Sequence, residues 1–358
     1  MEHSGLLDYL NENKSRLSPL LVLTHDYPDP DALASAFALL YLAERQFGIH
    51  GKIAYGGAIG RSENRAMARL LKIPAHKLRP GDYNHFPNVA LVDTQPSFDN
   101  NSFFRTRKAS IVIDQHPSTE PANAEFVQLD TEAGATSALL ARELLASGVE
   151  IPPRLATALV YGILSDTLDF YRVTKRETIE LYLKLLRLAD IRVLARIQKP
   201  ARPRKFFGEL AAGIDNARIR GRLIVSHLGA VESPDVVSQM ADFLLTCEGI
   251  QWSFCTGRYR DNLHMSLRTS LPDAQAGDVL RAISNHPREA GGHGQIAGGK
   301  IRIGNGQDET LWRATEETLA ERLLKQLGMG QRARVAPLLE PANGEPIVHK
   351  ESNDARSS

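Results

Sequence analysis

Residues 20–42, LLVLTHDYPDPDALASAFALLYL, decide how the first half of this chain folds. Residues 20–23 are a short apolar run that predicts a buried strand, and apolar residues recur at helical spacing from Ala32 onward, so a helix follows. His25, Asp29 and Asp31 lie in the connection between them. In open α/β sheets, ligands bind beyond the carboxyl ends of the strands, which is where this connection would lie. The stretch therefore predicts a binding site at the first strand-to-helix loop.

Two prolines stiffen this loop. Pro28 and Pro30 fix their own φ angles and push the preceding residues toward extended geometry, so Asp29 and Asp31 are expected to point to the same side. One imidazole and two carboxylates together suit a hard divalent cation such as Mn²⁺ or Mg²⁺. The alternative is that Asp31 caps the helix and Asp29 occupies a turn.

Strand ends further along the chain carry the same kinds of side chain. Residues 89–92 predict a strand that ends in Asp93, and residues 110–113 predict another that ends in Asp114, Gln115 and His116. Strands that alternate with helical segments are typical of an α/β fold with a mostly parallel sheet flanked by helices. Acids and histidines at three successive strand ends are therefore expected to converge on one edge of that sheet.

An apolar helix predicted from residue 153 runs into Asp166. The carboxyl end of a helix repels negative charge, so this carboxylate needs either a nearby cation or full exposure to water. A metal ion would meet that need.

The composition is that of a protein with two domains and no strong overall charge. The chain has 358 residues, 42% of them hydrophobic and 24% charged, and its net charge of +1 excludes a global field that would attract polyanions. Cys247 and Cys255 have no metal-binding or redox spacing. The N-terminus does not read as a signal peptide, and the longest apolar run is too short to cross a membrane. We therefore expect a cytoplasmic protein without membrane association.

The composition changes at residues 191–207, which carry six basic residues, two prolines and no acids. This change predicts a linker, and the alternative is direct contact between the basic residues and a polyanion. After residue 334 the chain becomes polar and loses its periodicity, which predicts a disordered tail. The expected division is a metal-binding domain at 1–190, a linker at 191–207, a smaller α/β domain at 208–334 with a cleft between the two domains, and a tail at 335–358.

The second domain contains a glycine-rich stretch, residues 291–299, that includes Gly291, Gly292 and His293. Such a loop lets backbone N–H groups approach an anion closely, and His293 would add a donor. Arg268, at the end of a predicted strand, is a plausible bidentate phosphate ligand. Together these residues predict a phosphate-binding or nucleotide-binding site.

The order and spacing of these residues resemble the motifs of the DHH phosphoesterases. The resemblance rests on His25-x3-Asp29-x-Asp31, Asp93, Asp114-Gln115-His116 and Gly162-x3-Asp166-Thr167, and it covers about residues 15–330. The segments SLRTS and AGGHGQIAGG are similar to the DHH-associated C-terminal domain, which binds nucleic acid. The layout looks closest to the nanoRNase/pAp-phosphatase branch.

The resemblance implies a site for one or two Mn²⁺ ions, with Mg²⁺ as the other candidate. It implies a first metal ion held by His25, Asp29 and Asp93, and a second held by Asp31, Asp93, Asp166 and a histidine whose place is taken here by Gln115. It also implies that His116 acts near the phosphate and the leaving group, with Asp114 in support. An amide is a weaker ligand than an imidazole, so Gln115 puts the second ion in doubt.

The function that follows from the resemblance is hydrolysis of phosphoester bonds in nucleotides or in short single-stranded oligonucleotides, as by an oligoribonuclease or exonuclease. One alternative is a nucleotide-binding regulator whose catalysis is weakened or lost because of Gln115. Another is a cyclic-dinucleotide phosphodiesterase. Longer single strands rank lower, because only 6% of the residues are aromatic and no basic stripe carries stacking aromatics. A homodimer is left open.

Overall fold

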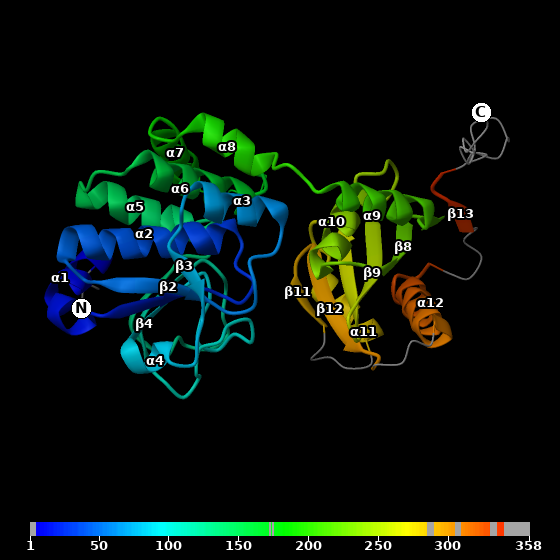
Figure 1. Ribbon diagram of the computed structural model, residues 1–358, viewed down its shortest axis with the longest axis horizontal. Helices are drawn as coiled ribbons and strands as arrows, with labels where there is room; N and C mark the ends of the chain where they lie inside the picture. The colour runs from blue at the N-terminus through cyan, green and yellow to red at the C-terminus, as the bar shows by residue number, and fades with distance from the viewer. Residues whose placement is uncertain are drawn as a thin grey trace, which may run out of the picture. The chain divides into compact units, whose positions relative to one another are not determined.

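The computed structural model describes residues 5–171, 173, 175–284, 290–304, 309–329 and 335–339, apart from the side chain of His293. The chain divides into two compact units, Met1–Ala201 and Arg202–Ser358, which are coloured blue to green and green to red in Figure 1. The predicted cleft between the two units stays a prediction.

The first unit alternates strands and helices along the chain. Its strands are β1 (Leu20–Leu23), β2 (Gly51–Tyr55), β3 (Ala75–Lys77), β4 (Asn88–Val92), β5 (Ala109–Asp114) and β6 (Ala124–Leu129). Its helices are α1 (Leu6–Leu17), α2 (Pro30–Phe47), α3 (Ser62–Leu70), α4 (Asp82–His85), α5 (Thr136–Ser147), α6 (Pro153–Asp166), α7 (Arg176–Leu186) and α8 (Ile191–Gln198).

The strands form one parallel sheet in the order β3-β2-β1-β4-β5-β6. The chain runs outward from β1 to β3 on one side and then returns to place β4 on the other side of β1. The strand order therefore reverses between β1 and β4, and this is the position at which open α/β sheets bind their ligands.

The two faces of the sheet are covered unequally. Alternate residues of β1 point to opposite faces: Leu20 and Val22 join a large core built with the helices, whereas Leu21 and Leu23 join a smaller core with Phe86. Figure 1 shows α2, α5, α6, α7 and α8 layered on one side and the short α4 on the other. The fold class predicted from the sequence, a mostly parallel sheet flanked by helices, is confirmed for this unit.

The second unit is a smaller α/β domain. Its strands are β7 (Arg218–Arg220), β8 (Leu223–Ala230), β9 (Trp252–Tyr259), β10 (Asn262–Thr269), β11 (Ala290–His293), β12 (Ile296–Arg302) and β13 (Val335–Pro337), and its helices are α9 (Arg204–Asp215), α10 (Pro234–Leu244), α11 (Ala276–Ile283) and α12 (Glu309–Gln326). They form a sheet in the order β11-β12-β10-β9-β8-β7-β13, in which β8 and β9 are parallel and the other pairs antiparallel.

Helices cover both faces of this second sheet. α11 and α12 pack against the face that presents Val225 and Phe254, and α10 packs against the face that presents Ile224 and Cys255. Figure 1 shows α9 and α10 on one side of the sheet and α11 and α12 on the other. The buried Cys255 is thus a small core residue.

Two segments differ from the predicted division. Most of the predicted linker is helical, because Asp190 caps α8 by accepting hydrogen bonds from the backbone N–H groups of Arg192 and Val193, and Leu194 and Ile197 are buried. The expected disordered tail begins with a short strand, β13, because the edge strand β7 offers its backbone as a partner. Residues 340–358 of that tail lie outside the described residues.

Among the described residues, no helix combines the length and the apolar character needed to span a membrane.

Candidate metal centre

Strand register brings the predicted ligands to one edge of the first sheet. β1 and β4 are adjacent, and Leu23 is paired with Leu91. His25 and Asp93 each follow two residues after this pair, so both emerge at the same level. β4 is also paired with β5 through Val92 and Ile113, which places Asp114 beside Asp93.

The loop after β1 ends in a capped helix. The Asp29 carboxylate accepts a hydrogen bond from the backbone N–H of Ala32 at 3.0 Å, and Pro30 occupies the first turn of α2. Asp29 is therefore the cap of α2, and the alternative in which Asp31 caps this helix is wrong. Asp31 is buried in the first turn.

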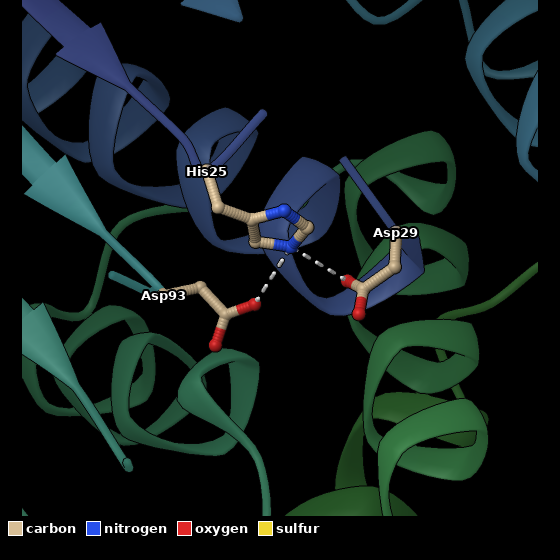
Figure 2. A group of neighbouring side chains, drawn as sticks. All are labelled: His25, Asp29 and Asp93. Carbon is tan, nitrogen blue, oxygen red and sulfur yellow. Dashed lines mark ion pairs between the residues drawn. The ribbon is translucent and has the colours of Figure 1, made fainter. Parts of the chain in front are cut away.

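His25, Asp29 and Asp93 form the first group of ligand-type side chains (Figure 2). The Nε2 atom of His25 lies 3.8 Å from Oδ1 of Asp29 and 3.6 Å from Oδ2 of Asp93. The Nδ1 atom of His25 lies 2.9 Å from the carbonyl oxygen of Asp26, so a proton on Nδ1 leaves the lone pair of Nε2 directed at the two carboxylates. This is the orientation of a metal-binding histidine.

Asp93, Asp114 and His116 form a second group next to the first. Nδ1 of His116 lies 2.8 Å from Oδ1 of Asp114 and 3.6 Å from Oδ1 of Asp93. The buried Asp114 also accepts hydrogen bonds from the backbone N–H groups of Gln115 and His116 and from the side-chain amide of Gln95. Asp114 is therefore held rigidly and in turn fixes the orientation of the His116 ring.

Asp31 and Asp166 belong to neither of these two groups within the described part of the chain. The two oxygens of Asp31 accept hydrogen bonds from the backbone N–H groups of Thr136 and Ser137, at 2.7 and 2.8 Å. Asp31 thereby caps α5, which has no cap of its own. Asp166 accepts a hydrogen bond of 2.9 Å from the side-chain amide of Gln115.

Burial and like charge perturb the carboxylates strongly. Burial raises the pKa of Asp93 well above its ordinary value, and the charges of Asp31 and Asp29 raise it further. The same causes raise the pKa of Asp166 to about 9. Burial also raises the pKa of Asp31, to about 6, and the charge of Asp29 adds to the effect.

The histidines and Asp29 shift in the opposite sense, because they have partners of opposite charge. Burial would lower the pKa of His25, but contact with Asp29 and the charge of Asp93 raise it to about 10. Loss of hydration would raise the pKa of Asp29, but contact with His25 lowers it to about 2. Burial likewise would lower the pKa of His116, and its hydrogen bond to Asp114 raises it instead.

These residues fit a divalent cation. Burial and the repulsion among four carboxylates raise the pKa values of three of them, and a bound metal ion would offset their negative charge. The available donors are carboxylate oxygens and one imidazole nitrogen, which suit hard or intermediate metals. Asp31 and Asp166 are close enough to interact electrostatically with carboxylates of the first group. Whether they or Gln115 bind a second ion stays a prediction.

Two polar residues of this site were not singled out from the sequence. Thr136 donates a hydrogen bond from Oγ1 to Oδ1 of Asp93 at 2.8 Å, and Gln95 donates one to Asp114 at 2.9 Å. Both side chains are fully buried. The only local signal for Gln95 is its position two residues after a strand-ending aspartate. The only local signal for Thr136 is that it is a hydroxyl residue at the start of a predicted helix.

The predicted phosphate ligands of the second unit lie on β10 and β11, which are separated in the sheet by β12. Arg268 is buried and donates hydrogen bonds to Asp242 at 2.5 Å and to the carbonyl oxygens of Leu267 and Ala297. It lines a cavity of about 280 Å³ together with His264 and with glycines 298 and 299. Its guanidinium is thus already partly neutralised.

The other predicted residues of that site lie on β11. Gly291 and Gly292 pair with Gly298 and Ala297 of β12. His293 ends the strand, and its side chain lies outside the described residues. The binding role of this glycine-rich hairpin stays a prediction.

Comparison with known proteins finds relatives of the whole chain and of part of it. The chain is 34% identical over 326 residues to an uncharacterized protein of Methanocaldococcus jannaschii, and the match covers 90% of this chain and 66% of that protein. It is 26% identical over 154 residues to a probable manganese-dependent inorganic pyrophosphatase of Streptococcus pyogenes, a match that covers 42% of this chain and 49% of the pyrophosphatase. The chain therefore spans less than two thirds of the length of either relative. No family model matches it.

Among solved structures, an exopolyphosphatase-related protein from Bacteroides fragilis has a similar fold. The TM-score is 0.69 at 16% identity, and the match covers 90% of this chain and 97% of the other. At this level of identity the likeness concerns the fold alone. The fold and the pyrophosphatase match agree with the resemblance to the DHH phosphoesterases, whereas the nanoRNase branch and the role of the second unit stay predictions.

Proposed function

We propose that this protein is a metal-dependent hydrolase of phosphoester bonds, acting on small nucleotides or very short single-stranded oligonucleotides. The observation that carries this proposal is the meeting of His25, Asp29 and Asp93 with the Asp114–His116 pair at the reversal point of the first sheet. The sequence match to a manganese-dependent pyrophosphatase supports phosphate chemistry and favours Mn²⁺.

The first group of side chains would hold the ion. His25 offers Nε2, Asp29 offers Oδ1 and Asp93 offers Oδ2. A divalent ion bound there would polarise a phosphoryl oxygen and supply an activated water molecule. Thr136 donates to the other oxygen of Asp93 and keeps that carboxylate from rotating.

His116 is placed to handle a proton. Burial would lower its pKa, but the hydrogen bond between its Nδ1 and Asp114 raises it, and the same bond anchors the ring. Nε2 of His116, which lies 3.3 Å from the side-chain nitrogen of Gln115, is then the atom that would protonate the oxygen of the leaving group. Asp114 would act by orienting the ring.

Product analysis with the purified full chain tests the proposal. The substrates are a 5′-phosphorylated dinucleotide, adenosine 3′,5′-bisphosphate and inorganic pyrophosphate, each with Mn²⁺ or with EDTA. We expect Mn²⁺-dependent release of mononucleotide or phosphate from the first two.

Asp93→Asn should lower kcat/KM by more than about a hundredfold. Asp130→Asn, which disrupts a surface ion pair with Lys175, is the matched control and should retain activity. Hydrolysis of pyrophosphate alone would make the protein a pyrophosphatase, and no hydrolysis would refute the proposal.

A second candidate function, a nucleotide-binding regulator without turnover, is favoured by one observation. The amide of Gln115 donates a hydrogen bond to Asp166 in the place where the resemblance implies a metal-binding imidazole. An amide in this orientation offers its nitrogen rather than an acceptor oxygen to the carboxylate. Retained nucleotide affinity without product release would establish this alternative.

A further inference from the structure

Tyr27 lies in the loop between His25 and Asp29, two residues from each of these predicted ligands. Its φ angle is 59°, in the left-handed region that glycine and asparagine adopt readily and that is unfavourable for an aromatic residue. The side chain is 65% exposed. The burial of an apolar ring therefore does not offset the unfavourable backbone conformation, and such outliers are concentrated at functional sites.

The backbone around Tyr27 is held by several partners. The N–H of Tyr27 donates to the carbonyl of Gly56 at 3.0 Å, and the N–H of Asp26 donates to the carbonyl of Asn100 at 2.6 Å. The Asp26 carboxylate also accepts a hydrogen bond from Ser102 at 2.8 Å. These bonds hold the backbone at Asp26 and at the N–H of Tyr27, where the left-handed residue begins.

One face of the Tyr27 ring rests on glycine backbone. A Cβ atom at Gly57 would lie 2.9 Å from three atoms of the ring, and Gly57 itself has a φ of 67°. A Cβ atom at Gly56 would lie 1.8 Å from Oδ1 of Asp26. Only two successive glycines allow this arrangement, which supports the ring from one side and leaves most of it open to solvent.

From these observations we propose that Tyr27 is a stacking platform for the nucleobase of a substrate whose phosphate lies at the metal centre. This inference rests on the proposed function and narrows its substrate class to molecules with a planar aromatic group. Bases stack on exposed aromatic rings with little regard to sequence. Inorganic pyrophosphate and polyphosphate have no such group, so the platform would distinguish nucleotides from them.

A binding measurement tests the platform independently of turnover. 2-Aminopurine riboside 5′-monophosphate is titrated into the full chain with Mn²⁺, and its fluorescence is followed, since stacking on an aromatic ring quenches it. We expect quenching with the wild-type chain and with Tyr27→Phe. Tyr27→Ala should lose the quenching and weaken binding about ten- to a hundredfold. Tyr27→Asn, which suits the left-handed backbone, should show the same loss with an unchanged or higher Tm. Equal quenching and affinity in the wild-type chain and Tyr27→Asn would overturn the proposal.

A kinetic measurement compares a 5′-phosphorylated dinucleotide with its abasic analogue. For Tyr27→Asn we expect kcat/KM to fall about ten- to a hundredfold on the first substrate and to stay unchanged on the second. Phe104→Ala is the control, because Phe104 is 55% exposed in the same unit but its ring contacts Tyr83. An equal fall on both substrates would overturn the platform. Quenching that depends on Tyr27 without any hydrolysis would support the platform and refute the hydrolase. Hydrolysis of the dinucleotide that is unaffected by Tyr27→Asn would refute the platform and support the hydrolase, whereas hydrolysis of pyrophosphate alone would refute both.

Discussion

Replacing Asp166 with Asn is expected to stabilise the metal-free protein and to weaken its response to Mn²⁺. The pKa of Asp166 is raised to about 9 by burial and by the charges of Asp31 and Asp29. At pH 8 the side chain is therefore ionised in the unfolded chain and largely neutral in the folded one, and folding must take up a proton. Asn has nearly the same shape and cannot ionise. Its side-chain oxygen can still accept the hydrogen bond from Gln115.

The magnitude follows from the size of the shift. One pKa unit corresponds to about 1.4 kcal/mol, so the full shift would cost the folded state about 6 kcal/mol at pH 8. Neighbouring carboxylates titrate together and share this cost, and we therefore expect a gain of about 2–3 kcal/mol. For a unit of about 200 residues this gain raises Tm by about 5–10 °C. A raised carboxylate pKa destabilises only above the unfolded value, so the gain should be small at pH 5 and grow toward pH 9.

The assay is thermal unfolding followed by circular dichroism at pH 5 and pH 8, with EDTA or with Mn²⁺. Asp130→Asn is the control: burial would raise the pKa of Asp130, but its ion pair with Lys175 lowers it. This control should lower Tm slightly and equally with and without metal. A lower Tm for Asp166→Asn than for the wild-type chain, in EDTA at pH 8, would refute a destabilising repulsion between Asp166 and the carboxylates of Asp31 and Asp29. A fully retained Mn²⁺ response would show that Asp166 is not a ligand.

Three further predictions concern pH, the second ion and the second unit. As the pH rises from about 4 to about 9, the metal-free wild-type chain should lose stability to urea, since the pKa values of Asp31 and Asp166 are raised to about 6 and about 9. Saturating Mn²⁺ should make the stability depend less on pH. Gln115→His should raise the Mn²⁺ affinity by about tenfold or more in calorimetric titration, because an imidazole binds the ion better than an amide does. An unchanged affinity would mean that residue 115 is not at a ligand position. Glu316→Gln should destabilise the second unit to urea by about 2–3 kcal/mol, because the buried Glu316 lies 3.0 Å from the Arg258 guanidinium, while Mn²⁺ affinity stays the same. An unchanged urea midpoint would contradict this last prediction.

The central strands were predictable from sequence, and the edge strands were not. β1, β4 and β5 are buried on both faces, so they stand out as apolar runs. β3 has three residues at one edge of the sheet and is only partly buried. β6, at the other edge, alternates between half-buried and exposed residues, but Val127 and Leu129 are among the exposed ones, so its sequence shows no matching alternation of apolar and polar residues.

The candidate site shows the same limit. That acids at the ends of parallel strands converge follows from the geometry of the sheet, so the meeting of His25, Asp29 and Asp93 could be anticipated. The partners of Asp31 could not, because the backbone groups that it caps lie more than a hundred residues later in the chain. Helix capping at that distance depends on how α2 and α5 pack, and no local pattern encodes that packing.

The pairing of Leu23 with Leu91 has a consequence for how this chain can vary. One residue inserted into β1 would turn its apolar side chains to the opposite faces and move His25 by about 3.3 Å along the strand, away from Asp93. The backbone hydrogen bonds between β1 and β4 thus set the positions of both the core side chains and the ligating atoms. A strand that is lengthened here would disturb the core and the metal centre together. Natural or engineered changes in length should therefore accumulate at exposed loops and should avoid the seam between β1 and β4.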